Sequence, residues 1–397
     1  MKIGIEVQRL FRKKKFGIET SSLELIKTLR EVEPQHEYVV FVKDDEDRNC
    51  LTPSENLKIK AIGGRIFVDF EQLFLPLAAK REQVDILHCT GNTAPYFSTV
   101  PIIQTLHDVI FMDAIPNSDS FYQIFGNHYR RKVVPLVTPR SRAVVTVSQY
   151  EKERIIQRLG INSDKVHVVY NGLNEKRFHQ NITAEQKQRT KEKYHLPDEF
   201  ILFLGNQSMR KNPLRAIEAY VKYASESGQP FALVTPGLSR SFIIRKLRQL
   251  SFPYSSRMFI TPGYIADEDL PALYALSKIF LFPSLSEGFG MPMIEAMACG
   301  TPVIASNATS LPEIAGNAAV LADPLQPDEI AYGITNLVEK EDLLRNKREA
   351  GYINAKRFSW KQSAETLLQL YEAVYIEATS PTKEPRFVNK HAFVTRD

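Results

Sequence analysis

A glycine-rich loop with a carboxylate at each end is the segment best suited to chemistry (residues 283–296). Gly288 and Gly290 leave backbone N–H groups uncovered in front of a predicted helix, where a phosphate group can bind. Glu287 precedes the loop, and Glu295 lies inside the helix after seven intervening residues. The Glu295 carboxylate can accept hydrogen bonds from two adjacent ribose hydroxyls. The alternative is that Glu295 only stabilises the first turns of its helix and that the glycines only shape a turn.

A pair of adjacent cations lies on a second turn between a strand and a helix. Arg210 and Lys211 follow a predicted strand and precede Asn212 and Pro213, a predicted N-cap and first helical residue. Two cations beside free backbone donors suit a diphosphate. A solvated basic turn is the alternative, but cations are disfavoured at a helix N-terminus unless an anion offsets them.

Two segments of the first half also follow predicted strands. His107 stands next to Asp108, where it can donate a hydrogen bond to a sugar hydroxyl or phosphate; a structural His–Asp pair is the alternative. Gly17 lies in a loop that can approach an anion closely, or it is a simple turn glycine. Ser21 and Glu24 fit a capping box and predict that a helix starts there.

Two segments of the second half complete the set. Tyr264 and Ile265 follow a Pro-Gly pair and offer an apolar backbone edge to a nucleobase. Ser310 and Glu313 fit a second capping box at a helix start. Both segments would line the same crevice as the loop at 283–296 if the sheet is doubly wound.

Short apolar strands that alternate with helical stretches must position these segments, which predicts an α/β protein with parallel sheets. In such sheets the ligand crevice lies at the carboxyl ends of the strands. The predicted strands are 2–7, 37–42, 85–88, 102–106, 143–147 and 166–169 in the first half, and 200–204, 231–235, 258–261, 279–282 and 302–305 in the second.

Length and composition favour two ordinary globular domains. The chain has 397 residues, of which 43% are hydrophobic and 24% are charged, and a single core rarely serves more than about 300 residues. The net charge of +5 is spread over both halves, so we expect no nucleic-acid partner. Cys50, Cys89 and Cys299 are too sparse for a disulfide framework or a metal site, and a reducing compartment is the simpler interpretation.

The first residues give no targeting signal. Glu6 interrupts the first apolar run, which therefore indicates a strand rather than a signal peptide. No apolar run in the sequence is long enough to span a membrane. We expect a cytoplasmic protein. The basic segment 9–15, in which Leu10 and Phe11 interleave with cations, predicts weak contact with the anionic inner face of the cell membrane; a solvated loop at the cleft mouth is the alternative.

Together these motifs resemble one known family. Glu287 and Glu295 in this setting are similar to the E-x7-E motif of the retaining glycosyltransferases of family 4 (glycosyl transferases group 1), which have the GT-B fold. The resemblance covers about residues 1–377. Further matches in order and spacing are Arg210-Lys211-Asn212, Gly263-Tyr264-Ile265, Ser310-Leu311-Pro312-Glu313, Gly17, His107-Asp108, Val147-Ser148 and Val169-Tyr170-Asn171-Gly172.

The resemblance implies two Rossmann-like, doubly wound domains that face one another across a cleft. Residues 1–175 would form the acceptor-binding domain and residues 176–360 the domain that binds the nucleotide sugar. A helix at 361–378 would cross back to the first domain, and residues 380–397 would form a loosely ordered tail.

Site roles are also implied by the resemblance. Glu287 and His107 would be catalytic, with His107 reaching across the cleft. The remaining residues would bind substrate: Arg210 and Lys211 the diphosphate, Glu295 the ribose, Tyr264 and Ile265 the base, Gly288, Phe289, Gly290 and Met291 the donor phosphate and sugar, and Gly17 an anion near the first loop. The chain departs from many members at Asn206, where they carry an arginine, and at Phe16, where they carry a glycine.

The implied activity is transfer of a hexose, with retention, from a nucleotide diphosphate sugar to a glycan or lipid-linked glycan. The form of the Arg210-Lys211-Asn212 turn resembles bacterial polysaccharide mannosyltransferases, so GDP-mannose is the first expectation and a UDP-sugar the second. No Asp-x-Asp motif or His/Cys cluster is present, and we expect neither a metal nor another cofactor. The alternatives are a sugar-nucleotide 2-epimerase and a non-catalytic nucleotide-binding partner protein.

Overall fold

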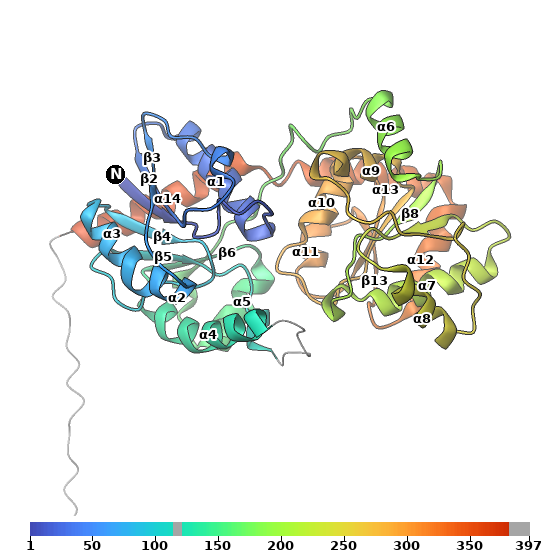
Figure 1. Ribbon diagram of the computed structural model, residues 1–397, viewed down its shortest axis with the longest axis horizontal. Helices are drawn as coiled ribbons and strands as arrows, with labels where there is room; N and C mark the ends of the chain where they lie inside the picture. Colours follow the sequence, from blue (N-terminus) through green and yellow to red (C-terminus); the bar gives the residue numbers. More distant parts are fainter. Residues whose placement is uncertain (114–120, 381–397) are drawn as a thin grey trace, which may run out of the picture.

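The computed structural model describes residues 1–113 and 121–380, which form two parallel sheets with helices on their faces (Figure 1). The central strands are apolar runs that are buried on both sides, as the sequence predicts for parallel sheets. This α/β architecture of two Rossmann-like halves confirms the predicted fold class.

The N-terminal sheet has the strand order β3-β2-β1-β4-β5-β6-β7. Its strands are β1 (Lys2–Glu6), β2 (Glu37–Val42), β3 (Leu57–Ala61), β4 (Ile86–Cys89), β5 (Ile102–Thr105), β6 (Ala143–Thr146) and β7 (Val166–Val168). Its helices are α1 (Gly17–Val32), α2 (Phe67–Asp69), a π-helical turn (Phe70–Phe74), α3 (Leu75–Arg81), α4 (Phe121–Val137) and α5 (Gln149–Leu159).

The C-terminal sheet has the order β10-β9-β8-β11-β12-β13. Its strands are β8 (Phe200–Leu202), β9 (Ala232–Val234), β10 (Phe259–Ile260), β11 (Ile279–Phe282), β12 (Val303–Ser306) and β13 (Ala319–Ala322). Its helices are α6 (Ala184–Tyr194), α7 (Pro213–Glu226), α8 (Arg240–Gln249), α9 (Leu270–Leu276), α10 (Met291–Ala298), α11 (Leu311–Ala315), α12 (Pro327–Glu339) and α13 (Glu341–Ala355).

Both sheets reverse their winding at one point, and this sets where ligands can bind. The reversal falls between β1 and β4 in the first sheet and between β8 and β11 in the second. Loops that leave the carboxyl ends of such neighbouring strands run to opposite faces and open a crevice between them.

Strands β3 and β13 are absent from the sequence prediction, and each is the edge of its sheet. An edge strand has one neighbour and is partly exposed, so β3 carries lysines at alternate positions and does not read as a buried run. β13 is a short, alanine-rich segment with a single β-branched residue, Val320, and so carries only a weak strand signal.

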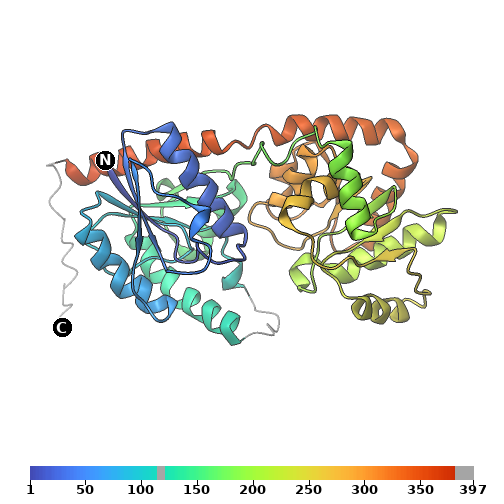
Figure 2. The same ribbon diagram turned by 45° about the horizontal axis from the view of Figure 1, so that its top comes forward.

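Helix α14 (Trp360–Thr379) leaves the C-terminal half and packs on the N-terminal half (Figure 2). Its Leu367 and Tyr371 lie in the same apolar core as Ile3 and Ile5 of β1. The chain passes between the halves once near Leu173 and again near Phe358. The two segments lie side by side, and Leu173 N donates to Phe358 O at 2.8 Å. The tail expected at 380–397 lies, from residue 381 on, outside the described residues.

The predicted start of the first helix is wrong, and the two apolar residues of the basic segment 9–15 are not exposed as expected. Helix α1 begins at Gly17 rather than Ser21, because the Glu19 carboxylate accepts a hydrogen bond from Phe16 N (3.1 Å) and caps the earlier turn. Leu10 and Phe11 are buried in the core of the N-terminal half, so they are not available to enter a membrane surface. Within the described part of the chain, no helix is both long and apolar enough to span a membrane.

Candidate active site between the two halves

Arg210, Lys211 and Glu287 form one ionic network at the switch point of the C-terminal sheet. The two cations lie on a short helical turn after β8, and Glu287 lies on the loop after the neighbouring strand β11. Arg210 Nη1 is 2.6 Å from Glu287 Oε2, and Lys211 Nζ is 2.6 Å from Glu287 Oε1. Groups that the sequence assigned to separate parts of a donor therefore contact one another directly.

The buried position of Glu287 makes this network electrostatically strong. Burial by itself would raise the pKa of the Glu287 carboxyl, but Lys211 and Arg210 outweigh it and hold the pKa below its usual value. Burial lowers the pKa of Lys211, an effect that Glu287 partly offsets. The carboxylate thus holds two adjacent cations close together.

The glycine loop leads into α10, which begins at Met291 as predicted, with Pro292 in its first turn. Gly290 has a φ of +102°, which favours glycine, and it bends the chain into the helix. Ser310 Oγ donates to Glu287 O at 2.8 Å and so holds the loop from the neighbouring strand. Phe289 is buried against the core of the C-terminal half.

Glu295 lies on α10 with one oxygen engaged. Tyr274 Oη donates to Glu295 Oε2 at 3.2 Å, and the other oxygen has no hydrogen-bond partner among residues 1–113 and 121–380. Burial raises the pKa of Glu295 to about 7, against the opposing charge of Arg177. A half-satisfied carboxylate at this position can accept a hydrogen bond from a ribose hydroxyl.

His107 meets the glycine loop from the other half of the molecule. A Cβ atom placed on Gly288 would lie 2.5 Å from His107 O, so only glycine allows this approach. His107 Nε2 lies 3.0 Å from Thr90 O, an acceptor only, so Nε2 carries the ring proton and donates it there. Burial lowers the pKa of His107, which favours the neutral ring. The Nε2–H donor expected for substrate is therefore occupied, and Nδ1 is left as an acceptor.

Asn212 and Ser310 stand at the predicted N-cap positions of α7 and α11, but their side chains make no capping hydrogen bond there. Glu313 binds the start of another helix instead of its own. The Glu313 carboxylate reaches the other half and accepts hydrogen bonds from Gln149 N (2.9 Å) and Tyr150 N (3.1 Å) at the start of α5. Asn212 has a left-handed backbone conformation, and its side chain joins the loops after β11 and β13. These residues hold segments distant in sequence, which a local motif does not reveal.

Three further predicted site residues differ in their exposure. They are Tyr264 and Ile265, predicted to flank a base, and Gly17 of the first loop. Tyr264 is 68% exposed, and Lys14 Nζ from the other half lies 5.1 Å from its ring centre. The Ile265 side chain is buried in the core, so it is not available to a ligand. Gly17 is the first residue of α1 and is open on the side where a Cβ would stand.

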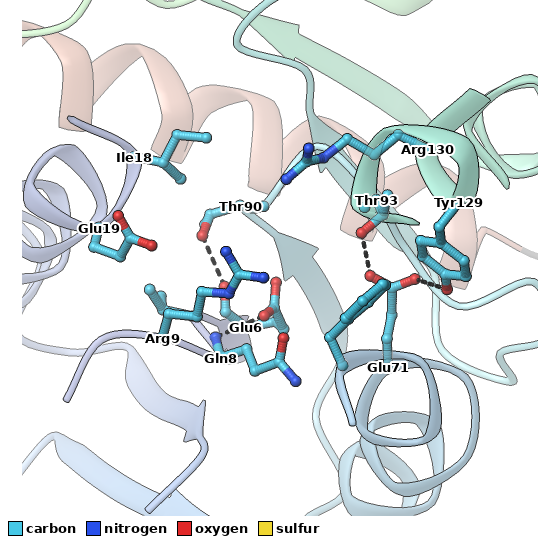
Figure 3. Close-up of a pocket in the computed structure, with 14 residues that line it drawn as sticks. Glu6, Gln8, Arg9, Ile18, Glu19, Glu71, Thr90, Thr93, Tyr129 and Arg130 are labelled. Atoms are coloured by element: carbon cyan, nitrogen blue, oxygen red, sulfur yellow. Dashed lines mark hydrogen bonds between the residues drawn. The ribbon is translucent and has the colours of Figure 1, made fainter. Parts of the chain in front are cut away.

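A second group of polar residues, which the motifs did not predict, lies at the switch point of the N-terminal sheet (Figure 3). It includes Glu6 at the end of β1 and Glu71 on the π-helical turn. The one available signal is the charge of Glu6 inside an otherwise apolar strand. No cluster of three or more His, Cys, Asp or Glu that would suit a metal is found in the described ranges.

Two facing Rossmann-like halves with polar groups at both switch points define a GT-B protein. The family Glycosyltransferase Family 4 matches residues 17–177, and the family Glycosyl transferases group 1 matches residues 184–358. The chain therefore belongs to the glycosyltransferases of group 1, family 4.

Similar proteins include several named for mannose transfer. The Serotype-specific mannosyltransferase WbdA of Escherichia coli is 33% identical over 62% of this chain, and the match spans only 30% of WbdA. The O-antigen chain mannosyltransferase B of Escherichia coli is 26% identical, with 90% of this chain and 96% of that protein covered. Anabaena HepE, solved with UDP and glucose, has a TM-score of 0.69 and 18% identity over 94% of this chain and 100% of HepE, which shows a shared fold.

Proposed function

We propose that this protein is a retaining glycosyltransferase that moves a hexose from a nucleotide diphosphate sugar to a glycan or lipid-linked glycan. The observation that carries the proposal is the network of Arg210, Lys211 and Glu287 beside the start of α10, with His107 facing it from the other half. Family membership supports the reaction class, and the two switch points offer separate places for donor and acceptor.

GDP-mannose is the proposed donor, and a UDP-sugar is the second candidate. Two relatives carry mannosyltransferase in their names, whereas the structural neighbour HepE is described with UDP and with UDP-glucose. The structural likeness bears on the fold alone, so the named relatives decide the order of preference.

Arg210 and Lys211 would bind the diphosphate and stabilise the charge that grows on it as it leaves. Both cations are already aligned on Glu287, so little reorganisation is needed when a diphosphate arrives. The N-terminus of α10 adds uncovered N–H groups on the same side. We propose that this charge stabilisation operates without a metal ion.

The proposed step conserves the anomeric configuration. The bond between the anomeric carbon and the diphosphate oxygen breaks, and the acceptor hydroxyl oxygen bonds to that carbon from the same face. The hydroxyl proton passes to the leaving diphosphate. Glu287, at the start of the loop, would stabilise positive charge on the sugar, and the backbone of His107 approaches the loop from the other half.

A reducing compartment, the cytoplasm, is the proposed location. Cys50, Cys89 and Cys299 are free thiols, and the last two are buried apart from one another in different halves.

A thermal-shift panel of sugar nucleotides, followed by product analysis, tests the proposal. A donor at 100 times its dissociation constant should stabilise the protein by about 2.7 kcal/mol. Arg210→Gln should abolish that shift, whereas Arg345→Gln, an exposed substitution on α13, should not. NMR of the product should show the donor's anomeric configuration. Binding without turnover would indicate a non-catalytic nucleotide-binding protein, and an epimerised donor would indicate a 2-epimerase.

A chelator provides a separate test of the metal-free proposal. Transfer should continue at an undiminished rate in EDTA, because the two cations supply the charge that a metal would otherwise supply. Complete loss of turnover in EDTA, restored by Mg²⁺ or Mn²⁺, would contradict it.

A further inference from the structure

The basic segment 9–15 of the N-terminal half makes a contact across the cleft that the proposed function does not use. Lys14, on the loop between β1 and α1, places its Nζ 5.1 Å from the centre of the Tyr264 ring. Tyr264 stands on the loop that follows β10 in the C-terminal half. The contact therefore joins a cation of one half to an aromatic ring of the other, at the carboxyl ends of both sheets.

Segment 9–15 is anchored in a way that leaves the Lys14 ammonium available. Leu10 and Phe11 are buried in the core of the N-terminal half. Lys15 Nζ donates to Asp47 Oδ2 at 2.5 Å, and Asp47 N donates to Phe11 O at 2.7 Å. Lys14 lies between these anchors and is exposed, and its ammonium has no hydrogen-bond or ion-pair partner within residues 1–113 and 121–380. Its three N–H donors can therefore serve a ligand.

Tyr264 offers an aromatic surface on a loop that is anchored in turn. The Tyr264 side chain is 68% exposed. Gly263 turns the chain before it with a φ of +82°, and the side chain of Ile265 after it is buried in the core of the C-terminal half. An exposed aromatic ring on an anchored loop can stack on a nucleobase of any type, because every base has a π face.

The Tyr264 loop leaves the sheet on the same side as the cation turn. β10, β9 and β8 are parallel neighbours, so this loop and the turn with Arg210 and Lys211 lie two strand spacings, about 10 Å, apart. Glu295 is tied to the same region, because Tyr274 of α9, which follows the loop, donates to its carboxylate. A nucleotide with its diphosphate on the cations and its ribose at Glu295 can therefore place its base on Tyr264.

The bases differ in what their edges offer to an ammonium group, which only donates hydrogen bonds. Guanine presents two adjacent acceptors, O6 and N7, and lysine commonly bonds to this pair. Adenine presents N7 beside an amino group that itself donates, and uracil presents the O4 acceptor alone. A cation held over the ring on which the base stacks therefore favours guanine.

From these contacts we infer that Lys14 selects the base of the donor. Its ammonium moves from the face of the Tyr264 ring to the O6 and N7 edge of a guanine that stacks on that ring. The inference rests on the proposed glycosyltransferase function and adds a residue that determines donor specificity. The N-terminal half thereby takes part in choosing the nucleotide, and the bound base bridges two side chains that otherwise contact each other directly.

Isothermal titration calorimetry of the full chain with GDP, ADP and UDP tests this inference. The wild-type protein should bind GDP about tenfold more tightly than ADP or UDP, as expected for a base edge with two acceptors. Lys14→Met keeps the length of the side chain and removes its donors. It should weaken GDP binding by about tenfold and change ADP and UDP binding by less than about threefold.

Lys13→Met is the matched control, since Lys13 is an exposed cation on the same loop. It should alter the binding of all three nucleotides equally and by less than about threefold, because exposed charges are screened by salt. The analogue 7-deaza-GDP, in which a C–H group replaces N7, should bind less tightly than GDP to the wild type and equally to Lys14→Met. Tyr264→Ala should weaken all three nucleotides, because stacking tolerates any base.

A wild-type preference for ADP or UDP, or equal binding of GDP and 7-deaza-GDP, would overturn the inference. So would an unchanged affinity of Lys14→Met for GDP, or an equal loss for all three nucleotides, which would place Lys14 on the diphosphate instead. In each of these cases the bound nucleotide still supports the glycosyltransferase proposal. Binding of none of the three nucleotides by the wild-type protein would reject the inference and also count against the proposed function.

Discussion

Glu287 illustrates how a single carboxylate can organise a binding site. Two adjacent cations repel one another by about 4 kcal/mol at 4 Å in a partly hydrated protein, and Glu287 offsets that repulsion by bonding to both. An arriving diphosphate would compete with the carboxylate for the same two cations. Glu287 orients the two cations, and under the proposed function it would also affect how tightly the diphosphate is held.

The two glutamates of the loop and helix should respond differently to substitution by glutamine. Glu287→Gln should lower turnover while the Michaelis constant for the donor stays within a few fold, because its charge matters most when positive charge develops on the sugar. Glu295→Gln should mainly raise that Michaelis constant, by roughly 10- to 100-fold, because a charge-assisted hydrogen bond to ribose is lost.

Steady-state kinetics with varied donor concentration measures both effects. Tyr274→Phe is the matched control for Glu295, since it removes the hydrogen bond to Oε2 and leaves the oxygen proposed for ribose in place. If Glu287→Gln turns over at the wild-type rate, the catalytic role of Glu287 has to be withdrawn, and the residue only shapes the loop.

Buried glutamates should make the protein less stable as the pH rises. Burial raises the pKa of Glu6, Glu151 and Glu295 to about 7, above the usual 4.5. Between these values the folded state holds protons that the unfolded chain has lost, so this stabilisation is lost as the pH rises through 7. The contribution of these groups to the free energy of unfolding should fall between about pH 4.5 and 7.5, by up to about 1.4 kcal/mol per pH unit for each proton held.

Urea unfolding across this pH range checks the prediction. Burial lowers the pKa of His88 and His107, and these histidines act in the opposite direction up to about pH 7. The difference in slope between the wild-type protein and Glu6→Gln therefore isolates the contribution of the glutamate. Glu6→Gln removes one of the three groups and should flatten the curve. An unchanged slope in that variant would mean that Glu6 is ionised at a lower pH than its burial indicates.

At the scale of elements, the crossing of two chain segments holds the C-terminal helix in place. Leu173 pairs with Ser359 in a parallel bridge, and Ser363 Oγ donates to Tyr170 O at 2.6 Å. Gly172 lies against Trp360, the first residue of α14, with no room for a side chain. This contact is where α14 turns from one half to the other.

Gly172→Ala should destabilise the fold by about 1–3 kcal/mol, the usual cost of overpacking. A Cβ at this position would lie 2.2 Å from Trp360 N, a backbone atom that cannot move without shifting α14. Gly228→Ala is the matched control, because a Cβ there meets nothing within 4 Å. Chemical unfolding measures both variants, and equal stability would show that the crossing adapts without strain.

At the scale of the whole molecule, a few polar contacts join the two halves at the cleft. Ser148 Oγ donates to Gly288 O at 2.8 Å, and Glu313 accepts from the first N–H groups of α5. Tyr170 Oη also donates to Glu313, at 2.9 Å. A carboxylate at a helix N-terminus is favourable, so Glu313 stabilises the arrangement in which the halves touch.

Removing that carboxylate should shift the molecule toward a more open arrangement. Glu313→Ala takes away three hydrogen bonds between the halves and leaves the cores of both intact. The radius of gyration from X-ray scattering should increase, and the Michaelis constant for the donor should rise. Glu339→Ala, exposed on α12, should leave both unchanged. An unaltered scattering profile would show that other contacts suffice to hold the halves together.

The sequence predicted most of the elements that form the C-terminal part of the candidate site. The loop after β11, the start of α10 at Met291 and the cation turn after β8 were predicted where they occur. Each of these elements depends on strand, loop and helix preferences within about a dozen neighbouring residues. Such local preferences can be recognised from the sequence alone. The central strands follow for the same reason, since burial on both faces makes them uniformly apolar.

Only the tertiary structure decided which of these groups touch. The sequence placed Glu287 on a sugar and the cations on a diphosphate, but the adjacency of β8 and β11 brings them into one network. Ser310 and Glu313 matched a local capping pattern. Their side-chain oxygens instead form hydrogen bonds with Glu287 and Gln149, which are distant in sequence. The sequence likewise did not predict that Leu10 and Phe11 are buried, or that a cavity lies at Glu6. Such contacts join residues far apart in the chain, and their geometry exists only after the sheets have formed and the halves have met.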